Sequence, residues 1–380
     1  MNFDPKNRAW VEIDSKAIEN NSRLLKNFIG NDCSLMAIVK ADGYGHGAVT
    51  VANAALAGGA TSFGVATLEE GIELRKSGFN DFQILILGNL ISSEELEAAL
   101  QWNLTPTISD IKEAIICNNI AKNSKNKFCL HLKVDTGMTR LGCDLNLVKE
   151  YITKIDKLEN VALKGIYSHL SIGDSNIKQN NYENFNEIQL KRFKKILNLI
   201  GKRKKSFCFH LANSAGTLAN NSFHFDMVRV GLSLYGYYPT NELKCSLNLS
   251  PALKIKARIT FIRDVDIGVG ISYGHLFTTK RKSKLAVLAI GYADGVSRAL
   301  SGKISASIDG VLVPQVGAIT MDQMIIDITD KPDTKIGQIC TILGQDGEVF
   351  ISPESWCDIT DSITWEILCG FKNRLPRIVI

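Results

Sequence analysis

Residues 35–47 read LMAIVKADGYGHG, an apolar run that ends at Lys40 and is followed directly by a glycine-rich turn. A short apolar run bounded by turn residues is typical of a buried strand. Lys40 would then lie at the edge of a core, where desolvation disfavours the charged form of a lysine and lowers its pKa. Covalent catalysis needs such a lysine, because only the neutral amine attacks a carbonyl group. Taken alone, the residue is better interpreted as a surface lysine before a loop. Whether Lys40 is a reactive lysine therefore depends on the rest of the chain.

Strand and helix patterns alternate through the first 240 residues. Ser93, which precedes Glu94 and Glu95, is the expected N-cap of one of the helices. Eight strand–helix repeats in this length predict a closed (β/α)8 TIM barrel of the α/β class, with a doubly wound open sheet as the alternative. The apolar runs cover residues 34–40, 62–67, 83–88, 104–109, 128–134, 162–169, 207–211 and 227–234, and helices are predicted over 48–57, 68–76, 93–100, 111–121 and 182–200.

The pattern changes after Pro239, where helical periodicity largely disappears. Apolar runs separated by Gly and Asp turns indicate a mainly-β domain, with one short helix near residues 362–368. We therefore expect a barrel over residues 1–240 and a mainly-β domain over 241–380, and the run at 9–13 could pair with the second domain. The β-like runs cover residues 253–262, 284–290, 305–308, 323–328 and 338–343.

The composition is that of an ordinary globular protein. Of 380 residues, 45% are hydrophobic and 22% are charged, which argues against disorder and membrane insertion. Residues 1–8 contain no apolar stretch that could act as a signal peptide, and no window reaches the roughly 18 apolar residues of a membrane helix. We therefore expect a cytoplasmic protein.

Cysteines and charge exclude further classes. The nine cysteines are scattered and form no pair with metal-ligand spacing, so buried reduced thiols are expected and no metal site. The net charge of +5 is slight for this size. The basic run at 202–205 follows an amphipathic helical stretch, and a solvated helix C-terminus explains it better than nucleic-acid binding.

Polar residues close several of the predicted strands. In a (β/α)8 barrel the active site forms at the C-terminal ends of the strands, and phosphate sites favour the loops after strands seven and eight. A lone His169 is more often a satisfied core histidine, but five polar groups that converge on one mouth are harder to dismiss. A reactive lysine near a phosphate site indicates pyridoxal phosphate. The candidates are Lys40, Lys133, Asp135, Arg140, His169, Ser214, Arg229 and Gly231.

Ordered motifs along nearly the whole chain extend this interpretation. They read VKADGYGHG (39–47), HLKVDTGMTRLG (131–142), HLANSAG (210–216), MVRVGL (227–232), ISYG (271–274), GYADG (291–295) and MDQ (321–323). Together they resemble the motifs of the alanine racemase family, whose fold is a (β/α)8 barrel followed by a β domain. The resemblance implies a homodimeric, pyridoxal-phosphate-dependent isomerase that interconverts L- and D-alanine and supplies D-alanine for peptidoglycan.

For the cofactor, the resemblance implies that Lys40 binds pyridoxal phosphate covalently and that Arg229 faces its pyridine nitrogen. A guanidinium is not deprotonated, so the ring nitrogen should stay unprotonated, which makes a weaker electron sink suited to proton exchange alone. His169 would bridge Arg229 and Tyr273. The phosphate would be bound by Tyr44, Ser214 and the backbone N–H groups of Gly231 and Leu232.

For the substrate, the resemblance implies two bases on opposite faces of the α-carbon, Lys40 and Tyr273. Tyr273 would come from the partner protomer, and a tyrosine needs positively charged neighbours to act as a base near neutral pH. Arg140 and the backbone N–H of the partner's Met321 would contact the substrate carboxylate. Lys133 aligns with a lysine that is carbamylated in many members, and a carbamate could pair with Arg140. The entrance corridor would be lined by Tyr292, Asp174 and Arg298.

Three positions depart from the family pattern. Asn373 stands where many members have a tyrosine, Ala318 where many carry an arginine of the corridor, and Thr320 where Cys or Ser is common. Asparagine cannot fill the volume of a tyrosine, so Ala318 and Asn373 together could leave a roomier mouth. Whether substrates other than alanine are accepted therefore stays open.

Three alternatives to a strict alanine racemase follow. The first is a racemase of broader side-chain range, which the corridor departures favour. The second is an amino-acid decarboxylase of the same architecture, and Arg229 argues against it because those enzymes pair the pyridine nitrogen with a carboxylate. The third is a non-enzymatic pyridoxal-phosphate carrier built of a single barrel, against which the whole second domain argues.

Overall fold

A computed structural model describes the chain except residues 1–5, 7, 125–126, 172–184, 202–205 and 246. The chain forms two compact units. The β unit comprises residues 1–15, 44–47 and 251–380, and the barrel unit comprises residues 16–43 and 48–250. The short segment 44–47, which directly follows Lys40 and the turn after it, thus belongs to the β unit.

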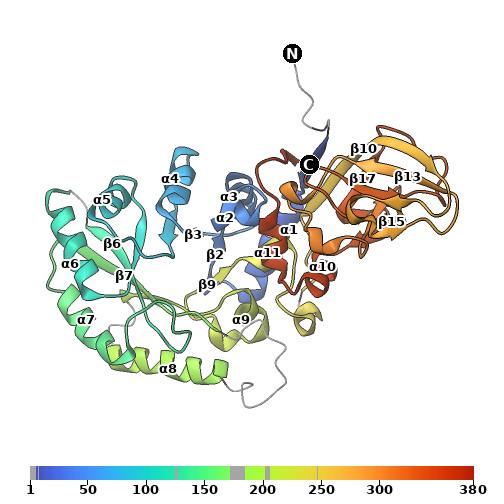
Figure 1. Ribbon diagram of the computed structural model, residues 1–380. Helices are drawn as coiled ribbons and strands as arrows, with labels where there is room; N and C mark the ends of the chain where they lie inside the picture. The colour runs from blue at the N-terminus through green and yellow to red at the C-terminus, as the bar shows by residue number, and fades with distance from the viewer. Residues whose placement is uncertain (1–5, 7, 125–126, 172–184, 202–205, 246) are drawn as a thin grey trace. The chain divides into compact units, whose positions relative to one another are not determined.

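Eight parallel strands close the barrel (Figure 1). The first and last strands pair in register from Ser34–Met227 to Ala37–Val230, which closes the sheet and excludes the open-sheet alternative. The prediction of a (β/α)8 barrel is therefore confirmed. In order around the barrel the strands are β2 (Ser34–Ile38), β3 (Ser62–Val65), β4 (Gln83–Ile86), β5 (Thr105–Ile108), β6 (Phe128–Lys133), β7 (Val161–Tyr167), β8 (Cys208–His210) and β9 (Met227–Val230).

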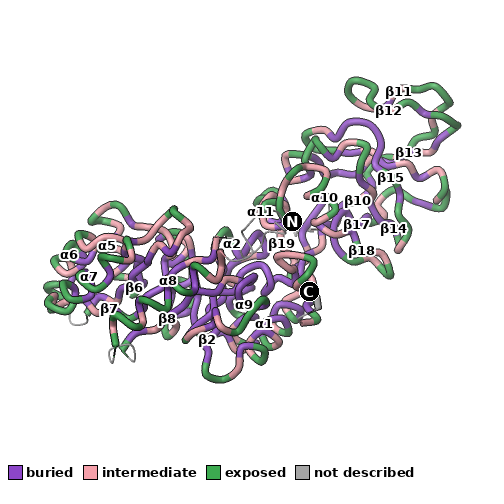
Figure 2. The backbone as a smooth tube through the Cα atoms, turned by 90° about the horizontal axis from the view of Figure 1, so that it is seen from below, coloured by how far each residue is buried: buried purple, intermediate pink, exposed green. Residues whose placement is uncertain are grey.

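One helix precedes the first barrel strand and the others follow barrel strands, and they cover the barrel with their apolar faces. The strands are buried and the outer faces of the helices are exposed (Figure 2), as expected for a parallel sheet covered by helices. The helices are α1 (Ser15–Ile29), α3 (Ala48–Ala57), α4 (Leu68–Lys76), α5 (Ser93–Gln101), α6 (Ile111–Ile120), α7 (Val148–Ile155), α8 (Phe185–Ile200) and α9 (Ser214–Ala219).

Two expected helix starts need comment. Ser93 was the expected N-cap of α5, and this is wrong by one residue. Ser92 is the cap: its hydroxyl accepts from the N–H of Glu95 at 3.1 Å, and the Glu95 carboxylate accepts from the N–H of Ser92 at 2.9 Å. This reciprocal capping box satisfies two backbone donors, which a cap at Ser93 would not. The start of the helix predicted over 182–200 lies partly outside the described residues, and α8 is described from Phe185.

The β unit is built on a nine-stranded sheet in the order β18-β17-β14-β15-β16-β13-β10-β1-β19. The N-terminal strand β1 lies antiparallel to β10 and parallel to β19, so the two ends of the chain are neighbours in one sheet. The strands are β1 (Ala9–Ile13), β10 (Leu253–Val265), β13 (Ser283–Leu288), β14 (Ser305–Ile308), β15 (Val311–Val316), β16 (Met324–Asp327), β17 (Ile339–Asp346), β18 (Val349–Ile351) and β19 (Arg377–Val379).

A two-stranded ribbon and two helices complete the β unit. The ribbon pairs β11 (Gly270–Ile271) with β12 (Phe277–Thr278). Ile271 anchors it in a small apolar core with Leu285 and Val316. The helices are α10 (Pro353–Thr360) and α11 (Thr364–Gly370), the latter close to the helix predicted near 362–368. The second domain is therefore mainly β, as the sequence predicts.

Candidate active site

Lys40 opens a turn of unusual hand. Strand β2 ends at Ile38, and the next element, α2 (Lys40–Tyr44), has positive φ at Ala41 (53°), Asp42 (51°), Gly43 (58°) and Tyr44 (52°). Only glycine adopts this left-handed conformation without steric cost. A run of three non-glycine residues there persists only where the surroundings over-determine it, which is a feature of functional sites.

Hydrogen bonds from outside the turn hold it in place. The N–H of Ala41 donates to the carboxylate of Glu70 at 2.7 Å, and the Asp42 carboxylate accepts from the N–H of Ala48 at 2.9 Å. At Gly43 a Cβ atom would lie 2.9 Å from the side chain of Val51, so a larger residue would disturb the turn. The turn after Lys40 is thereby held by its own backbone bond, from the N–H of Gly43 to the Val39 carbonyl (2.8 Å), and by the helices that carry Ala48 and Glu70.

Cationic side chains gather at the C-terminal ends of the barrel strands. Lys133 ends β6, and burial, reinforced by the charges of Arg229, Arg140 and Lys40, lowers its pKa to about 8. Burial and the same group of cations hold the pKa of His169 well below its usual value. Desolvation and like charges both disfavour the protonated forms here. Five of the predicted residues thus share one electrostatic environment, which suits a ligand with negative charge.

Arg229 lies at the centre of this group. Its Nη2 donates to the carbonyl oxygens of Ser168 (2.7 Å) and Leu211 (3.1 Å) and lies 3.1 Å from Nδ1 of His169. Burial lowers the pKa of Arg229 to about 10, so the guanidinium still carries its charge at neutral pH. Because arginine only donates, Nδ1 of His169 must accept, and the neutral ring carries its proton on Nε2.

A chain of buried hydrogen bonds runs behind Arg229. Its Nη1 lies 3.0 Å from Nδ1 of His210, whose Nε2 lies 3.0 Å from Nδ1 of His131. Nε2 of His131 lies 2.9 Å from the side-chain amide of Gln83. Since Arg229 must donate, His210 donates to His131, and His131 donates to the amide, whose oxygen and nitrogen exchange places by a rotation. Burial lowers the pKa of His131 to about 3 and that of His210 well below its usual value, so both rings are neutral.

The ring of Tyr167 supports the same group. It stacks on His210 with centroids 4.6 Å apart and planes within 5°, and the Arg229 guanidinium and the Lys133 ammonium lie 5.1 and 5.3 Å from its centroid. Its hydroxyl lies 2.8 Å from the hydroxyl of Thr107. An aromatic face attracts cations electrostatically, so Tyr167 holds both at the barrel mouth.

The loop after β6 carries Arg140. One oxygen of Asp135 accepts from the N–H groups of Gly137 (2.8 Å) and Thr139 (3.1 Å), which folds the loop back and leaves Arg140 exposed. The side chain of Gln189 in α8 joins this loop to the next by donating to Thr136 Oγ1 (3.0 Å) and to the His169 carbonyl (2.9 Å).

The residues predicted to bind phosphate lie in α9 and in the segment after β9. The Ser214 hydroxyl, at the start of α9, accepts from the N–H groups of Gly231 (3.1 Å) and Ser233 (3.4 Å). Leu232 begins a buried 3-10 turn, Leu232–Tyr235. The Ser233 hydroxyl is buried and has no hydrogen-bond partner among the described residues. Backbone donors and an unpaired hydroxyl in one place fit an anionic group such as a phosphate.

Other predicted residues belong to the β unit. Tyr273 is 71% exposed and Met321 is 53% exposed, and Tyr292 and Arg298 are exposed as well. Tyr44 is buried, and burial raises its pKa. Asp174 lies outside the described residues.

Sequence reasoning missed the layer behind Arg229. Gln83, His131, Tyr167 and His210 had no assigned role, although His131 and His210 occur inside motifs that the sequence analysis quotes. A signal exists: each is a polar or aromatic residue on an otherwise apolar barrel strand, where a polar side chain needs a buried partner.

Within the described residues, no group of three or more His, Cys, Asp or Glu side chains could hold a metal ion. The helices described in residues 6–380 include none that is long and apolar enough to cross a membrane.

Comparison with known proteins shows which family the chain resembles. The family described as "Alanine racemase, N-terminal domain" matches residues 13–239, and "Alanine racemase, C-terminal domain" matches residues 252–379. The chain is 54% identical over 379 residues to an alanine racemase of Prochlorococcus marinus, covering 100% of this chain and 97% of the relative. It is 44% identical over 375 residues to an alanine racemase of Synechocystis sp., covering 99% and 100%.

Solved structures agree. Alanine racemase from E. faecalis matches with a TM-score of 0.92 and 31% identity, covering 98% of both chains. Alanine racemase from Bartonella henselae, described with covalently bound pyridoxal phosphate, matches with a TM-score of 0.86 and 31% identity over 98% of this chain and 99% of that one. These matches over the whole chain define its class as that of the isomerases, in a family that is pyridoxal-phosphate-dependent. Within that class, the chain belongs to the alanine racemase family.

Proposed function

We propose that this chain interconverts L- and D-alanine by taking the α-proton from one face of the α-carbon and returning a proton to the other. The observation that carries the proposal is the buried, charged Arg229 at the centre of the cationic barrel mouth. The proposed physiological role is the supply of D-alanine for peptidoglycan, as in the family.

The residues present fit pyridoxal phosphate. Lys40, fixed by its left-handed turn, would hold the cofactor covalently. The Ser214 hydroxyl, the Gly231 and Leu232 backbone N–H groups and the unpaired Ser233 hydroxyl would surround its phosphate, with Tyr44 as a further contact. When bound, this cofactor supplies an electron sink for the α-carbon.

Arg229 would set the strength of that sink. Its Nη1 group contacts His210 and its Nη2 group contacts His169 and two carbonyl oxygens, and we infer that its Nε–H faces the pyridine nitrogen. A charged donor there keeps the ring nitrogen unprotonated, which restricts the chemistry to proton exchange. This argues against the decarboxylase alternative, whose pyridine nitrogen requires a carboxylate.

Two protein groups would move the proton. Lys40 would serve one face of the α-carbon and Tyr273 of a partner protomer the other, so that the substrate need not turn over. The support for Tyr273 is its exposed place in the ISYG motif. The neutral Nε2–H tautomer of His169 suits a hydrogen bond to the Tyr273 oxygen.

The substrate carboxylate would be oriented by Arg140 and by the backbone N–H of Met321. Lys133 would assist Arg140 as a carbamate. Its pKa of about 8 supports this, because a sizeable neutral fraction at neutral pH can combine with carbon dioxide. Tyr292, Arg298 and Asp174 would line the approach.

We extend the proposal to a homodimer with shared sites and to a cytoplasmic location. The eight cysteines whose side chains the structure describes are all free thiols, which suits a reducing compartment. Alanine is the proposed main substrate. Ala318 and Asn373 favour a wider range as the second candidate, and assays with L-serine and larger L-amino acids separate the two.

The decisive experiment is the visible spectrum of the purified protein before and after borohydride, followed by peptide mapping. We expect a yellow protein, loss of its visible absorbance on reduction, and a label on Lys40. A label on any other lysine would overturn the site. A colourless protein that fails to racemise alanine when the cofactor is added would overturn the function.

A further inference from the structure

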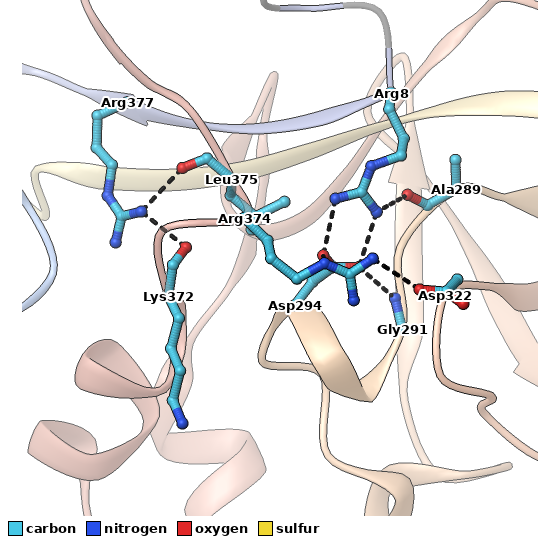
Figure 3. Close-up of polar contacts among 9 residues, drawn as sticks. All are labelled: Arg8, Ala289, Gly291, Asp294, Asp322, Lys372, Arg374, Leu375 and Arg377. Carbon is cyan, nitrogen blue, oxygen red and sulfur yellow. Dashed lines mark hydrogen bonds and ion pairs between the residues drawn. The ribbon is translucent and has the colours of Figure 1, made fainter.

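A buried carboxylate lies at one end of the GYADG motif in the β unit. Asp294 has no exposed surface, and a buried carboxylate is stable only when it is paired and hydrogen-bonded. Arg8, which precedes β1, forms a bidentate ion pair with this carboxylate. Its Nη2 donates to Oδ1 at 2.8 Å and its Nη1 donates to Oδ2 at 2.9 Å. The N–H of Gly291 donates to the same carboxylate at 3.0 Å (Figure 3).

A second arginine extends this contact to a second aspartate. Arg374 follows α11, and its Nε lies 3.6 Å from Oδ1 of Asp294. Its Nη2 lies 2.7 Å from Oδ1 of Asp322 (Figure 3). Arg8, Asp294, Arg374 and Asp322 thus form one chain of alternating charge, which we call the arginine–aspartate network. It joins segments from both ends of the sequence to the residue that follows Met321.

The C-terminal segment that carries Arg374 is itself held in shape. Arg377 donates to the carbonyl oxygens of Phe371 (2.6 Å), Lys372 and Leu375 (both 2.8 Å), and so folds the segment around its own guanidinium. Its Nε donates to the carbonyl of Gly45 at 3.1 Å. Arg374 therefore contacts Asp294 and Asp322 from a segment whose backbone is held by the hydrogen bonds of Arg377.

The turn capped by Asp294 fixes a peptide plane in the neighbouring loop. The N–H of Tyr292 donates to the Thr320 carbonyl at 3.0 Å, and the N–H of Ala293 donates to the Met321 carbonyl at 3.0 Å. In a trans peptide the carbonyl and the N–H point in opposite directions. Since the Thr320 carbonyl points at Tyr292, the N–H of Met321 must point away from this turn. At Gly291 a Cβ atom would lie 2.3 Å from the Thr320 carbonyl oxygen, so the turn and the loop are in direct contact.

We propose that Asp294 is a positioning residue, which directs the Met321 N–H toward the substrate carboxylate, and that Arg8 and Arg374 hold it in this role. The Asp294 carboxylate accepts a hydrogen bond from Gly291 and so holds the turn that begins there. The N–H groups of this turn hold the Thr320–Met321 peptide by its carbonyl oxygens. Arg374 holds the residue after Met321 through its ion pair with Asp322. This inference rests on the proposed function, where Met321 N–H receives the carboxylate.

The test separates positioning from a structural role. The variants are Arg374→Ala and the milder Arg8→Lys, which keeps the charge but loses the fork that matches a carboxylate. Arg281→Ala is the matched control, because it removes an exposed ion pair to Asp330 (2.5 Å) in the same unit. The holoenzymes are compared in KM and kcat for alanine, in thermal unfolding, and in spectral titration with propylamine, which carries an amino group but no carboxylate.

For Arg374→Ala we expect the KM for alanine to rise about tenfold, as for the loss of one charge-assisted hydrogen bond. kcat should stay within about twofold, because binding common to ground state and transition state is what is lost. Arg8→Lys should show a smaller rise in KM, and the propylamine titration and Arg281→Ala should match the unsubstituted enzyme.

Two outcomes would overturn the inference. One is an unchanged KM in folded Arg374→Ala and Arg8→Lys holoenzymes. The other is an equal loss of alanine binding, propylamine binding and thermal stability, which indicates a structural role alone. If the unsubstituted enzyme binds cofactor and racemises alanine in either case, the proposed function stands. If it does neither, the proposed function fails instead.

Discussion

The Tyr167 side chain contacts three polar residues of the barrel mouth through its ring rather than through its hydroxyl. The ring stacks on His210 and lies beside the charges of Arg229 and Lys133. We expect Tyr167→Phe to keep kcat/KM within about threefold, since only the bond to Thr107 is lost. Tyr167→Leu should lower kcat/KM by about tenfold or more, because stacking and cation–π contacts of about 1–2 kcal/mol disappear. Steady-state kinetics of the two variants checks this, and equal losses would contradict it.

The buried histidines make stability depend on pH at the residue scale. The pKa of His131 is about 3 in the folded protein, below the ordinary value near 6.5. Between these values the unfolded chain binds more protons, so the free energy of unfolding falls as the pH falls from 6.5 toward 3. His131→Gln should reduce this slope by about one proton, or roughly 1.4 kcal/mol per pH unit.

Urea unfolding at pH 7.0, 6.0 and 5.0 measures the effect of His131→Gln. An exposed histidine provides the control, since His275→Gln in the β unit removes a titrating group without a buried partner chain. Identical slopes for His131→Gln and the unsubstituted protein would show that His131 does not govern the acid sensitivity.

At the scale of elements, the turn from β11 to β12 carries strain directly before Tyr273. Ser272 has φ 62° and ψ −169°, a region populated almost only by glycine. Its hydroxyl donates to the Ala318 carbonyl at 2.8 Å, and at Gly317 a Cβ atom would lie 3.0 Å from the Ser272 Cβ. This hydrogen bond connects the ribbon to the loop that leads to Met321.

Two substitutions of Ser272 separate strain from fastening. Ser272→Gly removes about 1–3 kcal/mol of strain and loses a hydrogen bond of about 1 kcal/mol, so its stability should equal or exceed that of the unsubstituted protein. Ser272→Ala keeps the strain and loses the bond, so it should be less stable by about 1 kcal/mol. Both should lower kcat, because Tyr273 is less restrained. Thermal unfolding and kinetics check this; full kcat in Ser272→Gly would show that the fastening is dispensable.

For the whole molecule, the shared-site proposal predicts complementation. Lys40→Ala and Tyr273→Phe should each be nearly inactive. In a mixed dimer one site carries both defects and the other carries neither. Statistical re-association makes half of the dimers mixed, so about a quarter of all sites should be intact. Mixing the variants after mild dissociation, and assaying racemisation against each variant treated alone, measures the recovery. No recovery would count against sites built from two protomers.

The sequence predicts the parts of this molecule that depend on local pattern. Each barrel strand is a short apolar run before turn residues, and Ser214 begins a helix as its loop position suggests. Left-handed backbone at Ala41 could not be predicted, because alanine rarely adopts it, whereas an aspartate such as Asp42 does so more readily. The turn is held by a local hydrogen bond to Ala48 and by one to Glu70, which only the folded barrel brings near.

The layer behind Arg229 escaped prediction for a related reason. His131 and His210 lie on β6 and β8, which are not neighbouring strands, so their hydrogen bond crosses the interior of the barrel. The sequence shows that each histidine lies on a predicted strand, but it does not show which side chain the histidine contacts. The Arg8–Asp294 contact joins residues 286 positions apart and is equally hidden.

The place of β1 in the β unit has a consequence for biosynthesis. This strand is synthesised before every other described strand, yet it pairs with β10, which begins at Leu253, and with β19, which begins at Arg377. At a translation rate of about 5–20 residues per second, β1 waits on the order of tens of seconds for its neighbours. During that interval the barrel sequence can collapse on its own while an apolar strand remains unpaired beside it. Nascent chains of this protein should therefore engage chaperones through their first segment until the last strand emerges.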